Sequence, residues 1–185
     1  MGFSKNIKKE IQEFFLSRKQ YENNTVSTFN NLSNATSLAM FFCISSKTEL
    51  DEIRKLSRLA SKDYRELVIF VFADAYESFD VITNKAIHFF NLEDFTLFGK
   101  MKERLENLLE ERHFDLLISF EQTGLHVCQN IIASVKAGIK IGTDKTDNNN
   151  LYHLTLACNE EEFDIVRFYE QVKHYISVLN IKTTS

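Results

Sequence analysis

The sequence contains no proline, no tryptophan and only five glycines among its 185 residues. The absence of proline excludes cis-proline turns and proline-rich docking segments. Neither of the glycine-rich phosphate loops, GxGxxG and GxxxxGK[ST], occurs anywhere in the chain. The cysteines, Cys43, Cys128 and Cys158, are far apart, and an odd number without a secretory signal predicts reduced thiols in an intracellular, cytoplasmic protein.

Long apolar runs and an excess of positive charge are missing as well. The longest apolar runs, at 38–44 and 67–73, are about seven residues long, whereas a membrane span needs about 20. With 22 basic and 26 acidic side chains the formal charge is −4, which argues against a nucleic-acid interface. No HExxH or other metal-ligand spacing is present, so we expect neither a metal nor a cofactor.

What the chain does contain is an alternation of apolar runs and amphipathic helical segments. The apolar runs, each of strand length, lie at 38–44, 67–73, 86–90, 114–120, 139–141 and 151–157. Continuous runs separated by helices are typical of parallel strands buried on both faces. We therefore predict a doubly wound, mostly parallel α/β sheet of five to six strands (Rossmann-like), in the order 3-2-1-4-5-6. Helix ends are expected at a capping box opened by Thr48 with Asp51 and at a C-cap on Gly138.

An amphipathic helix is predicted ahead of this α/β domain. We expect the helix at 1–22, an Asn/Ser/Thr-rich linker at 23–37 and the domain at 38–185. Its basic and acidic side chains sum to 5 − 2 = +3. The helix is expected to bury one apolar stripe on its own domain, in a homodimer or on a protein partner, in preference to a membrane surface. The stripe consists of Phe3, Ile7, Ile11, Phe14 and Phe15.

A ligand site in such a sheet lies beyond the carboxyl ends of the strands. Two loops there carry our candidate ligand-binding residues, which are Cys43, Ser45, Ser46, Lys47, Glu121, Gln122, Thr123 and Gly124. Each has a structural alternative. Cys43 is a nucleophile or a small buried hydrophobe. Ser45 to Lys47 form a phosphate-like site or a turn with a helix cap. Glu121 is a general base or a charge at a helix N-terminus.

The loops at this edge are rich in carboxylates. Ten acids and two lysines occur in them, namely Asp74, Glu77, Asp80, Glu93, Asp94, Glu121, Asp144, Asp147, Glu160 and Glu161 against Lys47 and Lys145. Such a charge balance predicts weak binding of phosphorylated ligands. We interpret the acids as charges at helix N-termini, with a divalent cation as the alternative. The run 144–148 lacks the central glycine and closing glutamate of an EF-hand.

Several short segments resemble known families. FFNLEDFTLFGKMK, FDLLISF, ASVKAGIKIGTDK, LYHLTL, YISVLNIK and the opening KNIKKEIQEFF are similar to a family of small uncharacterised proteins from Bacteroidetes. That resemblance implies no activity. FDLLISF followed by a helix and IKIG also resembles the N-terminal half of heptosyltransferase-like glycosyltransferases, which need a second, nucleotide-sugar-binding domain that this chain has no room for.

These observations favour a non-catalytic binding or interaction module. The alternative is a small-ligand-binding protein or an enzyme with its site at the carboxyl edge of the sheet. A glycosyltransferase-like remnant is a third hypothesis.

Overall fold

The computed structural model describes residues 2–17, 34–73, 86–146, 151–158 and 163–181. Six strands form one sheet, and every neighbouring pair in it is parallel. The strands are β1 (Ser37–Ile44), β2 (Glu66–Ala73), β3 (Ile87–Phe90), β4 (His113–Ser119), β5 (Lys136–Thr143) and β6 (Leu154–Leu156). Their order, β3-β2-β1-β4-β5-β6, confirms both the predicted parallel sheet and its strand order.

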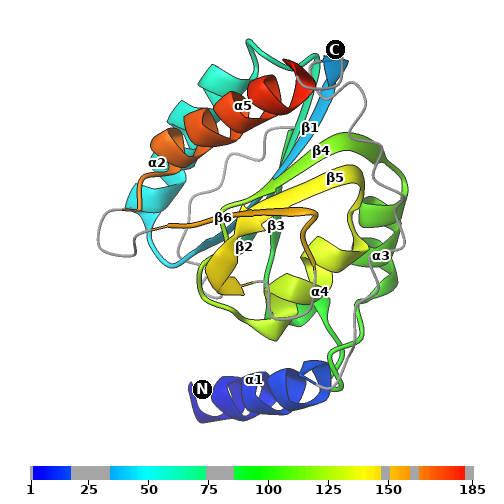
Figure 1. Cartoon of the computed structure of the whole chain (residues 1–185). Coiled ribbons are helices and arrows are strands. Elements are labelled where there is room, and N and C mark those ends of the chain that lie inside the picture. The colour runs from blue at the N-terminus through cyan, green and yellow to red at the C-terminus, as the bar shows by residue number, and fades with distance from the viewer. Residues whose placement is uncertain (1, 18–33, 74–85, 147–150, 159–162, 182–185) are drawn as a thin grey trace.

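Helices cover both faces of the sheet (Figure 1). They are α1 (Gly2–Leu16), α2 (Lys47–Ala60), α3 (Glu103–Glu110), α4 (His126–Ser134) and α5 (Ile165–Ile181), with short 3-10 turns at Leu92–Asp94 and Asp144–Thr146. Helices α2 and α5 lie on one face, and α3 and α4 lie on the other. Among the described residues no helix is long and apolar enough to cross a membrane.

The side chains of β1 alternate between two hydrophobic clusters. Leu38, Met40 and Phe42 belong to the cluster under α2 and α5, whereas Phe41 and Cys43 face the cluster under α3 and α4. This period of two follows from the pleat of a strand. Because both faces are covered, both sets are apolar, and the strand shows up in the sequence as a continuous apolar run.

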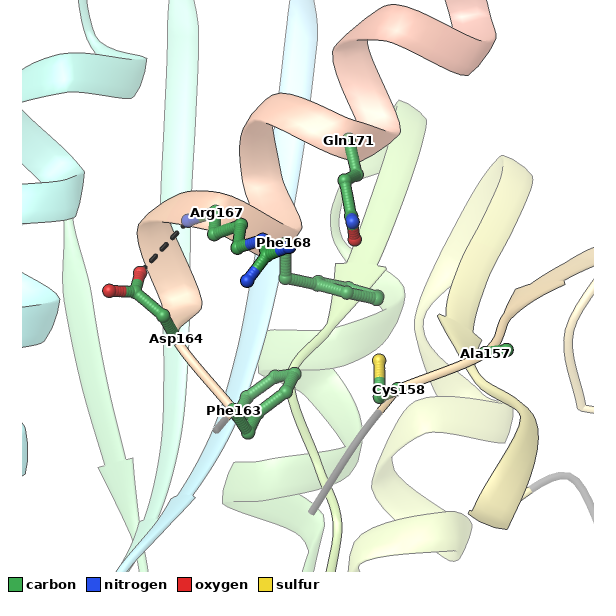
Figure 2. Close-up of a pocket in the computed structure, with 7 residues that line it drawn as sticks. All are labelled: Ala157, Cys158, Phe163, Asp164, Arg167, Phe168 and Gln171. Carbon is green, nitrogen blue, oxygen red and sulfur yellow. Dashed lines mark hydrogen bonds between the residues drawn. The ribbon is translucent and has the colours of Figure 1, made fainter. Parts of the chain in front are cut away.

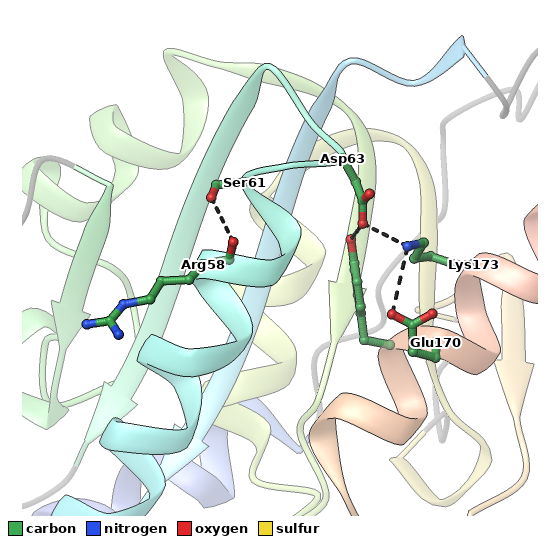
Figure 3. Close-up of polar contacts among 6 residues, drawn as sticks. Arg58, Ser61, Asp63, Glu170 and Lys173 are labelled. Carbon is green, nitrogen blue, oxygen red and sulfur yellow. Dashed lines mark hydrogen bonds and ion pairs between the residues drawn. The ribbon is translucent and has the colours of Figure 1, made fainter.

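A polar network joins α5 to the turn after α2 (Figure 3). The Tyr169 hydroxyl and the Lys173 ammonium each donate to the Asp63 carboxylate, both at 2.8 Å. The hydrogen bond from Lys173 is the main reason that the pKa of Asp63 is lowered. Burial raises the pKa of Tyr169, and so does its own hydrogen bond to the Asp63 carboxylate.

Two predicted helix ends are wrong. The capping box of α2 pairs Ser46 with Glu49, two residues ahead of the predicted Thr48 and Asp51. Helix α4 ends at Ser134, so Gly138 is no C-cap but a residue of β5. A Cβ on Gly138 would lie 3.2 Å from the Asp115 carbonyl oxygen of β4, so glycine allows the two strands to approach.

Other boundaries shift by a few residues. Strand β5 is longer than the predicted 139–141, and β6 is shorter than the predicted 151–157. Most of the predicted linker at 23–37 and the edge loops at 74–80 and 159–161 lie outside the described residues.

Candidate functional site

The two loops that carry the predicted site residues meet at the centre of the carboxyl edge. Strands β1 and β4 are neighbours, and the chain leaves them toward opposite sides of the sheet, to β2 and to β5. This arrangement makes the gap between them the topological switch point of the fold. The structure brings the Thr123 hydroxyl oxygen within 3.9 Å of the Cys43 sulfur.

The Ser45–Lys47 loop forms the start of α2. The Glu49 carboxylate accepts hydrogen bonds from the backbone N–H groups of Ser45 and Ser46, at 2.7 and 2.8 Å. The Ser46 hydroxyl accepts one in return from the Glu49 N–H at 3.3 Å. The Glu49 carboxylate thus satisfies the two amides that lead into α2, and the Ser46 hydroxyl satisfies the amide of the third residue of the helix.

Glu121 organises the second loop from a buried position. Its Oε1 accepts hydrogen bonds from the backbone N–H groups of Thr123 and Gly124, at 2.6 and 2.9 Å, and from the Thr123 hydroxyl. Gly124 has a φ of 66°, the left-handed conformation that glycine adopts without strain. Burial raises the pKa of Glu121, and these hydrogen bonds oppose that shift. The buried Gln122 side-chain nitrogen has no hydrogen-bond partner among the described residues.

A carboxylate from α1 caps the helix that follows this loop. Glu13 accepts hydrogen bonds from the backbone N–H groups of His126 at 2.9 Å and Val127 at 3.2 Å, the first two residues of α4. From the sequence, Glu13 is one of the acids of the predicted helix and nothing more. Nothing in the local sequence signals this cap, because its partners lie more than a hundred positions away along the chain.

Gln12 and Leu16 also contact the domain. The fully buried Gln12 side chain donates to the carbonyl oxygen of Thr96 at 2.8 Å and to that of Leu92 at 3.4 Å. The buried Leu16 side chain packs on Gly99, where a Cβ would lie 2.7 Å from Leu16 Cγ. The described part of α1 therefore contacts the domain through Gln12, Glu13 and Leu16.

Burial of the apolar stripe of α1 on its own domain, one of the three expected alternatives, does not hold for Phe14 and Phe15. Phe14 is 52% and Phe15 is 43% exposed, and Ile11 is half-buried. The side chains of Phe3 and Ile7 lie outside the described residues. The stripe points outward because the opposite face, with Gln12 and Glu13, satisfies backbone groups of the domain.

The outward face of α1 adjoins a second exposed apolar segment. Leu97 is 45% and Phe98 is 64% exposed, in the turn that Gln12 contacts. The rings of Phe15 and Phe98 meet edge to face, with centroids 5.2 Å apart, and Phe14 contacts Phe15 in the same way at 5.6 Å. Figure 1 shows α1 outside α4, with the loop before α3 reaching its end. We call Phe14, Phe15, Leu97 and Phe98 the apolar cluster.

A buried lysine, whose role the sequence did not indicate, lies at the C-terminal end of α4. The Lys140 ammonium of β5 donates to the carbonyl oxygens of Ile132 at 3.0 Å and Ala133 at 2.8 Å. Burial lowers the pKa of Lys140 from 10.5 to about 8. Charged side chains from other elements thus bind both ends of α4. The negative charge of Glu13 lies at its N-terminus and the positive charge of Lys140 at its C-terminus, as the helix dipole favours.

A pocket lies where the chain leads from β6 to α5 (Figure 2). Its volume is about 310 Å³, and its lining includes Cys158, Phe163, Arg167 and Phe168. Asp164 accepts hydrogen bonds there from the backbone N–H groups of Val166 at 2.7 Å and Arg167 at 2.9 Å. Within the described ranges no group of three or more His, Cys, Asp and Glu side chains is arranged to hold a metal ion.

Comparison with known proteins identifies the chain's family. The model of a family of unknown function (DUF6913) matches residues 4–179, so the chain belongs to that family. No curated protein and no solved structure matches the chain. The membership confirms the resemblance to uncharacterised proteins at the level of the family. It carries no information about a source organism or about glycosyl transfer.

Proposed function

We propose that this member of a family of unknown function is a non-catalytic interaction module. Its apolar cluster would bind an acidic, apolar segment of another protein. The observation that carries the proposal is the orientation of α1, which turns hydrogen-bonding side chains to the domain and leaves Phe14 and Phe15 exposed beside Leu97 and Phe98. Contiguous exposed apolar patches on soluble domains are typical of interaction sites.

The exposed area suits a protein interface of ordinary size. Given the exposed fractions of its members, the apolar cluster presents roughly 400 Å². A standard interface buries about 800 Å² per partner, of which somewhat more than half is non-polar. The apolar cluster can therefore supply most of the apolar part of one such interface.

The charges around the apolar cluster decide between its occupants. Lys100 and Lys102 are exposed in the same segment as Phe98. The Glu13 carboxylate is turned inward, so it does not offset these cations at the outer face. An isologous homodimer would bring the same cations against each other, which costs free energy. Carboxylates flanking an apolar segment would complement them.

The carboxyl edge of the sheet offers less support for a phosphate or nucleotide site. Side-chain carboxylates of the chain accept hydrogen bonds from the backbone amides at the starts of α2, α4 and α5 and in the loop after β4, through Glu49, Glu13, Asp164 and Glu121. A phosphate would need to displace one of these carboxylates to use the amides. All three cysteines are thiols, which supports a reducing, cytoplasmic setting for the interaction.

Site-specific photo-crosslinking in cells that produce the protein tests this proposal. Benzoylphenylalanine replaces Phe15 or Phe98, and in a control it replaces Tyr175, an exposed aromatic residue of α5 on the other side of the sheet. We expect adducts from Phe15 and Phe98 but not from Tyr175, joined to one protein through a peptide rich in Asp, Glu and apolar residues.

Other outcomes would refute the proposal. Adducts with the mass of two copies of the chain would identify the apolar cluster as a homodimer interface. Flotation of the purified protein with phosphatidylserine vesicles, abolished by Phe15→Ser and Phe98→Ser, would identify a membrane surface as the occupant. Equal labelling from all three positions would mean that the apolar cluster has no specific partner.

A further inference from the structure

The pocket at the start of α5 lies on the opposite side of the sheet from the apolar cluster (Figures 1 and 2). It follows the outermost strand, β6, and is separate from the switch point between β1 and β4. Its volume of about 310 Å³ is close to the lower limit of ligand pockets, which is about 300 Å³. The pocket therefore has the size of a small-molecule site.

Part of the pocket wall is aromatic and is fixed by the core. Phe168 is 2% exposed, and its ring contacts that of Phe163 at a centroid distance of 5.6 Å. Phe120 contacts Phe168 edge to face at 5.5 Å and itself stacks on Phe42 of β1 at 4.5 Å. Because further rings hold Phe168 in place, this wall is formed before any ligand binds.

Two polar side chains of α5 line the same pocket. Arg167 and Gln171 are four positions apart, so they lie one turn apart on one side of the helix. In Figure 2 the side chains of Gln171 and Phe168 extend from α5 toward Cys158. Within the described part of the chain, neither the Arg167 guanidinium nor the Gln171 amide takes part in a hydrogen bond or an ion pair. The pocket thus offers a positive charge and an amide that the chain itself does not satisfy.

We propose that this pocket binds a small organic carboxylate. The Arg167 guanidinium and the Gln171 amide donate hydrogen bonds to the carboxylate, and an aromatic or branched apolar group of the ligand packs against Phe163 and Phe168. A guanidinium matches a carboxylate in charge and in the spacing of its donors. This inference concerns a small molecule and is independent of the proposed recognition of a protein at the apolar cluster.

The other polar groups at the pocket leave the guanidinium available. Asp164 accepts hydrogen bonds from two backbone N–H groups at the start of α5, at 2.7 and 2.9 Å, and not from the Arg167 guanidinium. Cys158 is a neutral thiol, because burial raises its pKa; Asp144 adds to this shift and Lys145 opposes it. Since Asp144 and Lys145 carry opposite charges, together they add little net charge beside Cys158.

These groups favour a carboxylate over a phosphate. A phosphate site typically uses the free backbone amides of a helix N-terminus together with basic side chains. Here Asp164 accepts hydrogen bonds from the first amides of α5, and Arg167 is the only basic residue that lines the pocket among the described residues. One guanidinium balances the single negative charge of a carboxylate.

Titration of the isotope-labelled whole chain with phenylacetate near pH 7, followed by NMR, tests this proposal. The backbone signals of Cys158, Phe163 and Arg167 should shift and reach saturation, with a Kd of about 1 mM or lower. Phenylacetamide, which has nearly the same shape and no charge, should bind at least about tenfold more weakly. Inorganic phosphate should cause no saturable shift of these signals.

A substitution of Arg167 tests the origin of the affinity. Arg167→Gln removes the charge and keeps an exposed polar side chain, so it should weaken phenylacetate binding about tenfold or more. Arg58→Gln is the matched control, because Arg58 is an exposed arginine of α2 that does not line the pocket (Figure 3). This variant should bind phenylacetate like the unmodified chain.

The thiol of Cys158 provides a second measurement at the pocket itself. With phenylacetate at ten times its Kd, labelling of Cys158 by iodoacetamide, followed by peptide mapping, should slow about tenfold. Cys43 lies at the switch point and serves as the internal reference. Its labelling rate should be the same with and without phenylacetate.

Several results would overturn the proposal. Equal binding of phenylacetate and phenylacetamide would identify an apolar slot, and tighter binding of phosphate would identify an anion site of another class. An unchanged Kd in Arg167→Gln, shifts centred outside the pocket, or no saturable shift at about 10 mM phenylacetate would each rule out the assignment. The NMR spectrum of each variant shows at the same time that it is folded.

Discussion

The contact of Glu13 with α4 determines how α1 sits on the domain, so replacing Glu13 by Ala should loosen this helix. The substitution removes both side-chain acceptors from the amides of His126 and Val127. Loss of a helix cap costs about 1 kcal/mol, and loss of a negative charge at a helix N-terminus costs up to about 1 kcal/mol more. A total of about 2 kcal/mol would raise the population of detached α1 about 30-fold.

Hydrogen exchange followed by mass spectrometry measures this change directly. In the Glu13→Ala variant, the backbone amides of α1 and the first amides of α4 should exchange about 30-fold faster, whereas those of β1 and β4 should be little affected. Glu10→Ala is the matched control, because Glu10 is one turn away or less on the same helix and exposed. Glu13→Gln should fall between the two, since it keeps one acceptor oxygen and loses the charge.

Two results would refute this reasoning. Equal exchange in the Glu13→Ala and Glu10→Ala variants would mean that the cap contributes nothing to the docking of α1. A uniform increase across the sheet would mean that α1 and the domain unfold as one unit, so that no separate docking equilibrium exists.

Three further substitutions test the site and its supports. The pKa of Lys140 is about 8 in the folded protein and 10.5 in the unfolded chain. Between pH 8 and 10.5 the unfolded chain therefore binds more protons than the folded protein, and stability increases with pH. The free energy of unfolding should rise by about 2 kcal/mol from pH 8 to about 9.5. Urea titrations should show no such rise in Lys140→Met, and an equal rise would contradict the assignment. The raised pKa of Glu121 makes the native state hold its proton longer, so thermal stability should fall as pH rises above 4.5, and Glu121→Gln should abolish this fall. A Cβ on Gly142 would lie 2.3 Å from Tyr152 Cζ, so Gly142→Ala should lower the free energy of unfolding by about 1 to 3 kcal/mol in urea, and a change within error would contradict the close contact.

The sheet could be predicted from the sequence because its signal is local. Strands such as β1 and β2 are buried on both faces and therefore form continuous apolar runs, and right-handed crossovers leave few orders for them. The helix ends were harder to predict. Ser46 and Thr48 both fit a cap, and Gly138 fits a helix end as well as a close approach of two strands.

The orientation of α1 could not be predicted, because an apolar stripe does not reveal what covers it. Ile11, Phe14 and Phe15 gave the expected helical spacing, but the hydrogen bonds of Gln12 and Glu13 reach backbone groups about 80 to 110 positions away. These distant bonds, which no local pattern encodes, place the polar face on the domain.

The candidate site was predictable in part for the same reason. Topology alone brings Cys43 and Thr123 to one edge, since Cys43 lies near the end of β1 and Thr123 follows β4, its neighbour in the sheet. Cys128 belongs to the hydrophobic cluster that Cys43 faces, and no local pattern in the sequence indicates this.

The Glu13 cap connects two features of this fold that otherwise look unrelated. In doubly wound sheets, a helix N-terminus at the switch point is where an anionic ligand is stabilised by backbone amides. Here the amides that begin α4 bind a carboxylate of α1. Gln12, Glu13 and Leu16 together define the side of α1 that faces the domain, and at about 100° per residue Phe14 and Phe15 lie on the other side. The contact that closes the usual ligand edge thus exposes the aromatic face, which is why we infer that recognition occurs at α1 and not at the edge of the sheet.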